Sequence, residues 1–330
     1  MRTYATPLRD RFRNLDARDG VLLRGPAGWG EFSPFWDYSD AESVPWLRAA
    51  VEAATLPYPD AVRESVPVNA TVPAVGPERA AEIVRASGCA TVKVKVAQAG
   101  QSLADDLDRV AAVRDALGAS GFIRVDANAA WSVSDAVDAL PRIARAAGGL
   151  EYAEQPVASV EDLARVRRAV DVPIAADESI RRASDPLAVV RAEAADVIVM
   201  KVQPMGGVRA CLALAEQVGL PITVSSALES SVGIAAGVAL AAALPRTNAA
   251  GLSTVSMFAR DVCSSPLLPV DGALPVGRVI PDALSSGDLG SDDLHQGALT
   301  SAPADLDRAW RDRLDRVAAL AGIDLAEVLA

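Results

Sequence analysis

Lysine is rare in this chain, and the few lysines lie in apolar runs rather than in segments expected at the surface. Of the 32 Lys and Arg residues, only Lys93, Lys95 and Lys201 are lysines. Lys93 and Lys95 lie in "TVKVKV" and Lys201 in "VIVMKVQP", two β-branched runs that predict buried strands. Arginine stays protonated at ordinary pH, whereas a buried lysine can lose its proton and act as a base. This placement indicates proton-transfer chemistry.

Carboxylates recur between the lysines at the ends of further strand-like runs. The steps from Lys95 to Asp126, Glu154, Asp177 and Lys201 are 31, 28, 23 and 24 residues, each about one strand–helix unit. If the strands are parallel neighbours, these side chains reach the same rim. Other polar residues near these strand ends are Asn128, Glu178, Ser225, Ser226 and Glu229.

The common rim has two chemical consequences. Three converging carboxylates repel one another unless a cation lies between them, and oxygen ligands of this kind favour a hard ion such as Mg²⁺. A single strand-end Asp is more often a helix cap, so the shared register carries the prediction. Lys93 and Lys95 lie on one face of their strand, and neighbouring ammonium groups lower each other's pKa. One of the two lysines is therefore expected to be neutral and basic near pH 7.

The elements that must position these residues alternate along the chain from about residue 67. Amphipathic helices are predicted at 103–119 and 134–148, with others between most of the remaining strands. Eight strands with intervening helices favour a (β/α) barrel over an open doubly wound sheet, although both share the alternation. The predicted strands are "VNATVPAV", "TVKVKV", "FIRVDAN", "LEYAEQP", "VPIAADES", "VIVMKVQP", "PITVSSALE" and "GLSTV".

The first part of the chain predicts a separate unit. Residues 1–65 form an α+β domain with a hairpin in 20–40, part of 285–330 joins it, and the barrel occupies 66–284. The segment after the hairpin is rich in aromatic residues, which either form a packing interface or cover a pocket. These aromatic residues are Trp29, Phe32, Phe35, Trp36 and Tyr38.

Composition excludes several classes of function. The net charge of −11 argues against nucleic-acid binding. Cys89, Cys211 and Cys263 are odd in number and widely spaced, which is typical of a reducing compartment. With no apolar signal core and no spanning run, a cytoplasmic protein without membrane contact is expected. The single histidine, His295, lies in a polar, glycine-rich stretch, so a Ser-His-Asp triad or a His-rich zinc site is not expected.

The motifs "KVK", "DAN", "EQP", "ADES" and "MKVQPMGG", in this order, resemble the muconate-lactonizing subgroup of the enolase superfamily. The segment "GWGEFSPF" resembles that superfamily's N-terminal capping domain. The resemblance implies a modified TIM barrel of (β/α)7β type with an α+β capping domain. It also implies that Asp126, Glu154 and Asp177 bind Mg²⁺, with Lys95 and Lys201 on opposite faces of a small carboxylate substrate.

Within the subgroup, "RVDAN", "SSALESSVG" and the cap motif resemble the members that make 2-succinylbenzoate for menaquinone biosynthesis. This implies a hydro-lyase that dehydrates 2-succinyl-6-hydroxy-2,4-cyclohexadiene-1-carboxylate. Lys95 would remove the proton alpha to the carboxylate and then protonate the departing hydroxyl, while Lys201 stays cationic. The alternatives on the same site are N-succinylamino acid racemisation, dipeptide epimerisation and muconate cycloisomerisation. Dipeptide epimerases usually carry Asp-x-Asp on the last strand, where this chain has only Asp261, well past the strand.

Substrate contacts are predicted from the same strand ends. Arg124 lies two residues before Asp126 and points to the same face, so it could hold a substrate carboxylate; a structural ion pair inside the barrel is the alternative. The remaining predicted contacts are Lys93, Asn128, Ser225 and Ser226. A Schiff-base aldolase would use one lysine and no metal, which leaves the aligned carboxylates without a purpose. A barrel retained only for binding predicts the loss of a ligand or a lysine, and none is lost. The oligomeric state is left open.

Overall fold

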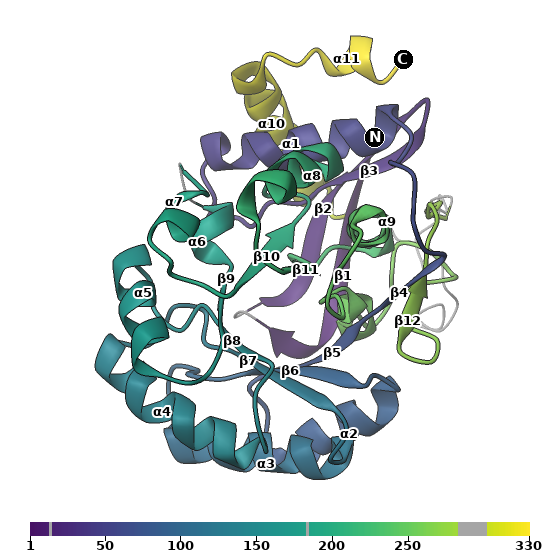
Figure 1. Cartoon of the computed structure of the whole chain (residues 1–330). Helices are drawn as coiled ribbons and strands as arrows, with labels where there is room; N and C mark the ends of the chain where they lie inside the picture. Colours follow the sequence, from purple (N-terminus) through teal and green to yellow (C-terminus); the bar gives the residue numbers. More distant parts are fainter. Residues whose placement is uncertain (13–14, 183–184, 283–301) are drawn as a thin grey trace.

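The computed structural model describes residues 1–12, 15–182, 185–282 and 302–330. Its centre is a parallel seven-stranded sheet in the order β11-β10-β9-β8-β7-β6-β5, so each strand pairs with the next along the chain. Sequential order of parallel strands is typical of a (β/α) barrel, and the sheet curls as such a barrel does (Figure 1). The strands are β5 (Asn69–Val72), β6 (Thr91–Lys95), β7 (Phe122–Asp126), β8 (Tyr152–Glu154), β9 (Ile174–Ala176), β10 (Val197–Lys201) and β11 (Ile222–Ser225).

The two edges of this sheet are joined by a short contact rather than by an eighth strand. Ala250 makes a parallel bridge with Val68 beside β5, and Gly251 makes one with Ser225 of β11. A Cβ on Gly251 would lie 2.7 Å from the Ser225 Oγ, so the close approach requires glycine. The prediction that "GLSTV" forms a strand is therefore wrong in extent: the chain turns at once into the 3-10 helix η1 (Ser253–Met257).

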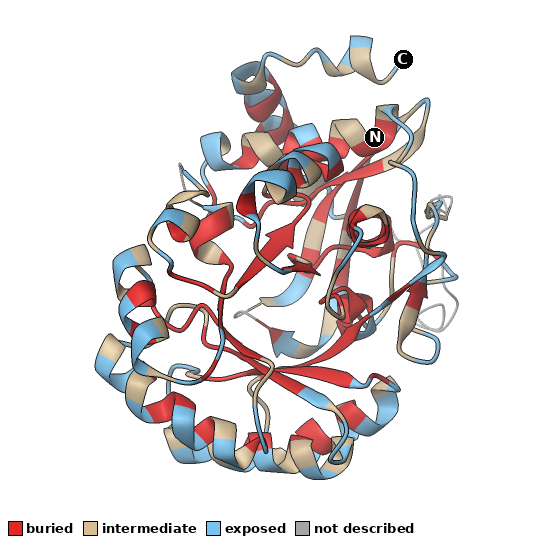
Figure 2. Ribbon diagram, in the orientation of Figure 1, coloured by how far each residue is buried: buried red, intermediate tan, exposed pale blue. Residues whose placement is uncertain are grey.

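Helices coat the outside of the barrel. Apart from α9, their inner faces are buried and their outer faces exposed, while the strands are buried except at Phe122, where β7 begins (Figure 2). Ser102 and Ser132 cap α3 and α4 in reciprocal capping boxes, which is why these helices begin close to their predicted starts. The barrel helices are α2 (Pro77–Ser87), α3 (Leu103–Leu117), α4 (Val133–Ala146), α5 (Val160–Ala169), α6 (Glu178–Arg181), α7 (Ala188–Arg191), α8 (Val208–Val218) and α9 (Ser231–Ala243).

The N-terminal part forms a three-stranded antiparallel sheet with a helix packed on it. The sheet order is β1-β2-β3, and the predicted hairpin in 20–40 is confirmed as β2 and β3. Helix α10 packs along α1, so segments from both ends of the described chain build this cap (Figure 1). The cap elements are β1 (Arg2–Phe12), β2 (Leu15–Gly25), β3 (Gly28–Phe32), α1 (Asp40–Thr55), α10 (Ala304–Ala321) and α11 (Leu325–Val328).

The core of the cap is aromatic and depends on residues far apart in sequence. The rings of Phe32 and Trp310 meet edge to face with centroids 5.9 Å apart, and Phe35 meets Trp46 in the same way at 6.0 Å. Trp46 and Trp310 are fully buried. The predicted aromatic cluster is thus partly a packing interface. The domain boundaries of 65 and 284 stay a prediction.

The remaining elements tie the barrel together. Twelve of the thirteen residues of α9 are buried, which explains why it is apolar on all sides. Strand β12 (Ala273–Pro275) pairs antiparallel with β4 (Ser65–Pro67). His295 lies outside the described residues. Within the described ranges, no helix is long and apolar enough to cross a bilayer.

Candidate active site

Strand register brings the predicted residues to one rim. Lys95 is the direct partner of Asp126 on the next strand, and Asp126 is the partner of Glu154. Asp177 follows β9 by one residue, and Lys201 ends β10. These five residues are each no more than 8% exposed, so their charges must be balanced within the barrel.

Lysines and carboxylates pair directly at this rim. The Lys95 Nζ donates to the Asp126 Oδ2 at 2.5 Å, and the Lys201 Nζ donates to the Asp177 Oδ2 at 2.5 Å. The Lys93 Nζ lies between two carboxylates, 3.1 Å from the Asp126 Oδ2 and 3.0 Å from the Glu154 Oε1. All three lysines therefore face the carboxylates, as their strand positions predict.

The charges shift the protonation of these groups in different directions. Burial lowers the pKa of Lys93, but the carboxylates of Glu154 and Asp126 outweigh it and raise the pKa above its ordinary value. The expectation that neighbouring ammonium groups depress the pKa is therefore wrong for Lys93, because it faces carboxylates. Burial alone would raise the pKa of Asp126, but the charges of Lys95 and Lys93 hold it well below its usual range. Burial and the nearby Asp126 and Asp177 raise the pKa of Glu154 to about 7.

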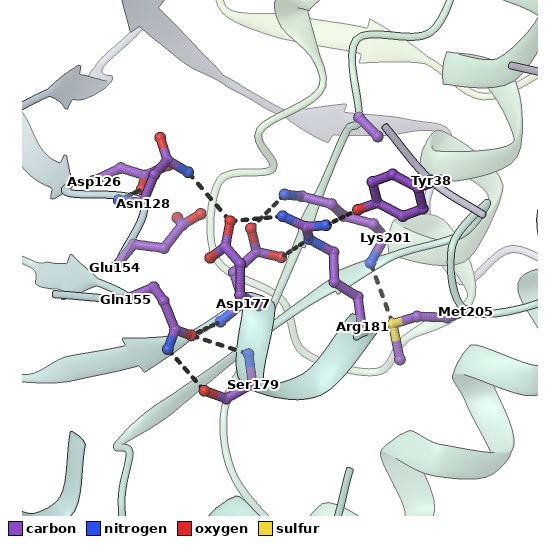
Figure 3. A network of polar contacts seen from close by, with 12 residues as sticks. Tyr38, Asp126, Asn128, Glu154, Gln155, Asp177, Ser179, Arg181, Lys201 and Met205 are labelled. Atoms are coloured by element: carbon purple, nitrogen blue, oxygen red, sulfur yellow. Dashed lines mark hydrogen bonds and ion pairs between the residues drawn. The ribbon is translucent and has the colours of Figure 1, made fainter. Parts of the chain in front are cut away.

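The three carboxylates have the chemistry of a divalent-cation site, although ammonium groups hold them in this structure. Asp126, Glu154 and Asp177 lie on neighbouring strand ends and point into a shared space (Figure 3). Their oxygens are the hard ligands that Mg²⁺ prefers. In the described part of the chain, no group of three or more Asp, Glu, His or Cys side chains is placed as a ready-made metal site. The positive charge there comes from Lys93, Lys95, Lys201 and Arg181.

Two residues that the sequence interpretation did not select shape this rim. The Gln155 Oε1 accepts from the backbone N–H groups of Asp177 at 3.0 Å and of Ser179 at 3.2 Å. The Arg181 Nε donates to the Asp177 Oδ1 at 2.9 Å, and the Arg181 Nη1 donates to the Tyr38 hydroxyl of the cap (Figure 3). The available signal was the i, i+4 spacing of Asp177 and Arg181 on one short helix.

Two spaces adjoin the lysines. An inner pocket is lined by all three lysines together with Ser225 and Ser226. A larger cavity of about 1050 Å³ lies between the cap and the rim, with Lys95 and Asn128 in its wall. Its cap side includes Phe35, Trp36 and Tyr38, so this part of the aromatic cluster covers a cavity, the second of the two roles expected.

Arg124 and Asp261 point away from this chemistry. The Arg124 Nε donates to the Glu151 Oε2 at 2.7 Å, and its Nη1 donates to Asn69 and to the Ala249 carbonyl. Glu151 precedes β8, so these contacts lie toward the opposite end of the strands, and they favour the ion-pair alternative for Arg124. The Asp261 Oδ1 accepts from the Ser231 N–H at the start of α9.

A second group of buried carboxylates joins the cap to the barrel. Glu31 of β3 accepts from the Tyr4 and Ser33 hydroxyls, from the Ser230 N–H and hydroxyl, and from the Gly233 N–H. Glu229 lies beside it, and its Oε2 accepts from the Ala227 N–H at 2.8 Å. Burial, helped by the charge of Glu31, raises the pKa of Glu229 to about 7.

Comparison with known proteins agrees with this architecture. Residues 77–282 match the model of the family described as Enolase C-terminal domain-like, and residues 3–54 match Enolase N-terminal domain-like. The muconate lactonizing enzyme from Pseudomonas fluorescens complexed with muconolactone has the same fold, with a TM-score of 0.72 and 22% identity over 85% of this chain and 94% of that one. The dipeptide epimerase from Enterococcus faecalis V583 complexed with Mg and L-Leu-L-Tyr has a TM-score of 0.71 and 23% identity over 85% and 96%.

The chain belongs to the enolase superfamily, and its cap and barrel are the two domains of that fold. Two curated relatives within the superfamily carry the same name. The o-succinylbenzoate synthase of Thermobifida fusca (strain YX) is 62% identical over 84% of this chain and 87% of that protein. The o-succinylbenzoate synthase of Mycolicibacterium smegmatis (strain ATCC 700084 / mc(2)155) is 54% identical over 86% and 87%.

Proposed function

We propose that the chain is an o-succinylbenzoate synthase, a hydro-lyase that converts 2-succinyl-6-hydroxy-2,4-cyclohexadiene-1-carboxylate to 2-succinylbenzoate and water. The observation that carries the choice of reaction is the 62% identity to the Thermobifida fusca enzyme over 84% of the chain. The site supports the chemistry, because buried lysines and carboxylates meet at one rim beside a cavity of about 1050 Å³. That volume is sufficient for a substrate with one ring and a succinyl side chain.

In this proposal the proton transfers belong to Lys95. The neutral amine removes the proton from the ring carbon that bears the carboxylate, and the electron pair moves into that carboxylate as an enediolate. The resulting ammonium then protonates the hydroxyl on the adjacent carbon, which leaves as water as the ring becomes aromatic. One base thus serves as general base and general acid in turn.

Lys201 has a different role. Its ammonium is held by Asp177 at 2.5 Å and is nearly excluded from solvent. A fixed positive charge in such a place stabilises the negative charge of the enediolate without reorganisation. Ser225, Ser226, Asn128 and Lys93 complete the proposed substrate contacts, since the serines and Lys93 line the inner pocket and Asn128 accepts from the Lys95 Nζ at 2.6 Å.

A divalent cation, Mg²⁺, is part of the proposal. Asp126, Glu154 and Asp177 would hold it, because three buried carboxylates on adjacent strand ends form a hard oxygen donor set. When bound, Mg²⁺ supplies positive charge at the carboxylate on which the enediolate develops. In this structure the compensating charge at these three residues comes from Lys93, Lys95, Lys201 and Arg181.

The test is a direct assay. Purified protein with Mg²⁺ and the cyclohexadiene substrate should form 2-succinylbenzoate, which is measured by chromatography. The Lys95→Arg variant should form almost none. The racemase alternative is separated in the same experiment by offering an N-succinylamino acid in D₂O. Deuterium exchange and racemisation of that compound, with no aromatic product from the cyclohexadiene, would replace the proposed reaction.

A further inference from the structure

Helix α3 carries a buried ion pair outside the site described above. The Arg109 Nη1 donates to the Asp106 Oδ1 at 2.8 Å, and the two residues are 1% and 2% exposed. A buried ion pair is seldom worth more to stability than apolar side chains of similar volume. Apolar side chains could anchor this helix equally well, so stability alone does not account for the pair.

The pair holds the backbone on both sides of the end of β6. The Arg109 Nη1 donates to the Lys95 carbonyl at 2.9 Å, and the Asp106 Oδ2 accepts from the Ala97 N–H at 2.9 Å. The Arg109 Nε donates to the Val75 carbonyl at 2.7 Å, which ties in the loop after β5. One guanidinium thus joins two neighbouring loops, which the planar fork of arginine can do and a lysine cannot.

The held segment needs such support. Ala97 has φ of 59°, a left-handed conformation that is unfavourable for a residue with a side chain. The sheet pairing of β6 with β7 ends at Lys95, and the Val96 N–H makes a further bond to the Asp126 carbonyl at 3.1 Å. Beyond that bond, the contact from Asp106 fixes the turn at Ala97.

The same segment forms part of the cavity wall and carries the base. Lys95, Ala97 and Ala99 line the large cavity together with Pro73 and Ala74 from the neighbouring loop. A shift of this wall would therefore move the Lys95 backbone and the cavity surface together.

We propose that Asp106 and Arg109 form a positioning pair, which fixes the backbone at Lys95 and the adjoining cavity wall so that the Lys95 side chain is held toward the substrate. The catalytic part of this inference rests on the proposed function, in which Lys95 is the base. The pair touches no substrate and acts only through Lys95 and the wall. A misplacement of about 1 Å of a catalytic group can cost about 100-fold in rate, so loss of the pair should be visible in turnover.

The test is the double variant Asp106→Leu/Arg109→Met, which removes both charges and leaves neither buried alone. We expect kcat to fall at least tenfold and KM to change less than kcat, while the Kd for Mn²⁺ stays within about twofold of wild type. Amide hydrogen exchange in a peptide covering residues 94–100 should become at least tenfold faster, while exchange in 122–128 stays unchanged. Hydrogen exchange and Mn²⁺ binding need no turnover. They therefore report on the backbone at 94–100 and on the metal site whether or not the enzyme catalyses the proposed reaction.

A matched control pair is available at the other end of the strands. The Arg167 Nε donates to the Asp196 Oδ1 at 2.9 Å, and the Asp196 Oδ2 accepts from the Ile174 N–H at the start of β9. Arg167→Met/Asp196→Leu removes a clamp with the same contacts to a strand backbone, but with side chains 32% and 33% exposed, far from the rim. It should lower the midpoint of unfolding without changing kcat or exchange in 94–100.

The outcomes separate the two proposals. Wild-type kcat or unchanged exchange in 94–100 for the double variant, with an active parent, would overturn the positioning pair and leave the proposed function standing. If the parent fails to dehydrate the substrate, the proposed function fails, and the exchange measurement alone decides whether the pair holds this segment. If the double variant does not fold, Arg109→Lys replaces it. This variant keeps the charge beside Asp106 but cannot reach both the Lys95 and the Val75 carbonyls. Wild-type exchange and kcat for Arg109→Lys would refute the inference.

Discussion

Replacing Glu229 by glutamine tests the electrostatics of the junction between cap and barrel. Glu229 is 1% exposed, and its Oε2 accepts from the Ala227 N–H. The Oε1 is buried with no hydrogen-bond partner among the described residues. Glutamine has nearly the same shape and can still accept from Ala227, but it cannot ionise. The substitution therefore removes the charge with little change in packing.

The magnitude follows from the pKa of Glu229, which burial and Glu31 raise from 4.5 to about 7. An acid whose folded pKa lies above its unfolded pKa binds more protons in the folded state between the two values. Stability therefore falls as pH rises through this window, and the full cost is present above the folded pKa. At 1.36 kcal/mol per pKa unit, the cost is about 3 kcal/mol at pH 8 and about 1 kcal/mol at pH 5.

The assay is urea unfolding of both proteins at pH 5, 6, 7 and 8, followed by tryptophan fluorescence. Relative to wild type, Glu229→Gln should gain about 2 kcal/mol in free energy of unfolding between pH 5 and pH 8. Glu31→Gln is the contrasting control, because the Glu31 carboxylate accepts from several donors and the amide NH₂ would face some of them. It should destabilise the protein by about 1.5–3 kcal/mol for each charge-assisted bond lost. A Glu229→Gln difference that is constant from pH 5 to pH 8 would refute the reasoning.

Three further predictions concern the site. Lys95→Arg should abolish dehydration while substrate binding, measured by calorimetry, survives, and substantial turnover by this variant would show that another group is the base. Lys201→Arg keeps a cation and should retain some turnover. Exhaustive treatment with a chelator should abolish activity and added Mg²⁺ should restore it; full activity without divalent cations would contradict the assignment of Asp126, Glu154 and Asp177. Arg124→Met removes a buried guanidinium from Glu151, which is partly exposed, and should lower the free energy of unfolding in urea titrations by about 1.5–3 kcal/mol for the charge-assisted bond lost. A raised KM in a fully stable variant would instead return Arg124 to substrate binding.

The rim could be predicted from the sequence because a parallel β/α repeat delivers one strand end per unit. The spacing of Lys95, Asp126, Glu154, Asp177 and Lys201 was sufficient to predict that they meet, and the pairing of adjacent strands places them together. The fold followed from the same alternation and is confirmed by the ordered seven-stranded sheet.

The misses have physical reasons. Strand alternation says which face Arg124 is on but not toward which end of the barrel its long side chain extends, and Glu151 decides that. The last predicted strand was too long because closing the barrel takes only the contacts around Ala250 and Gly251. The contact of Arg181 with Tyr38 joins residues 143 apart in sequence, and no local pattern reports it.

The composition of the cap has a consequence for how the chain is made. Strands β1, β2 and β3 emerge from the ribosome early, but Trp310, Leu314 and Val317, which complete their apolar cluster, follow more than 250 residues later. At typical synthesis rates of about 5–20 residues per second, the first strands wait on the order of tens of seconds for their partner helix. During that time Val21, Leu23 and Phe32 can pack against Trp46 and Leu47 of α1, but the α10 side of their cluster is missing. The first strands to be synthesised are thus part of a domain that can be completed only after the barrel has been made, and a nascent chain stalled before α10 should be the form that chaperones bind most readily.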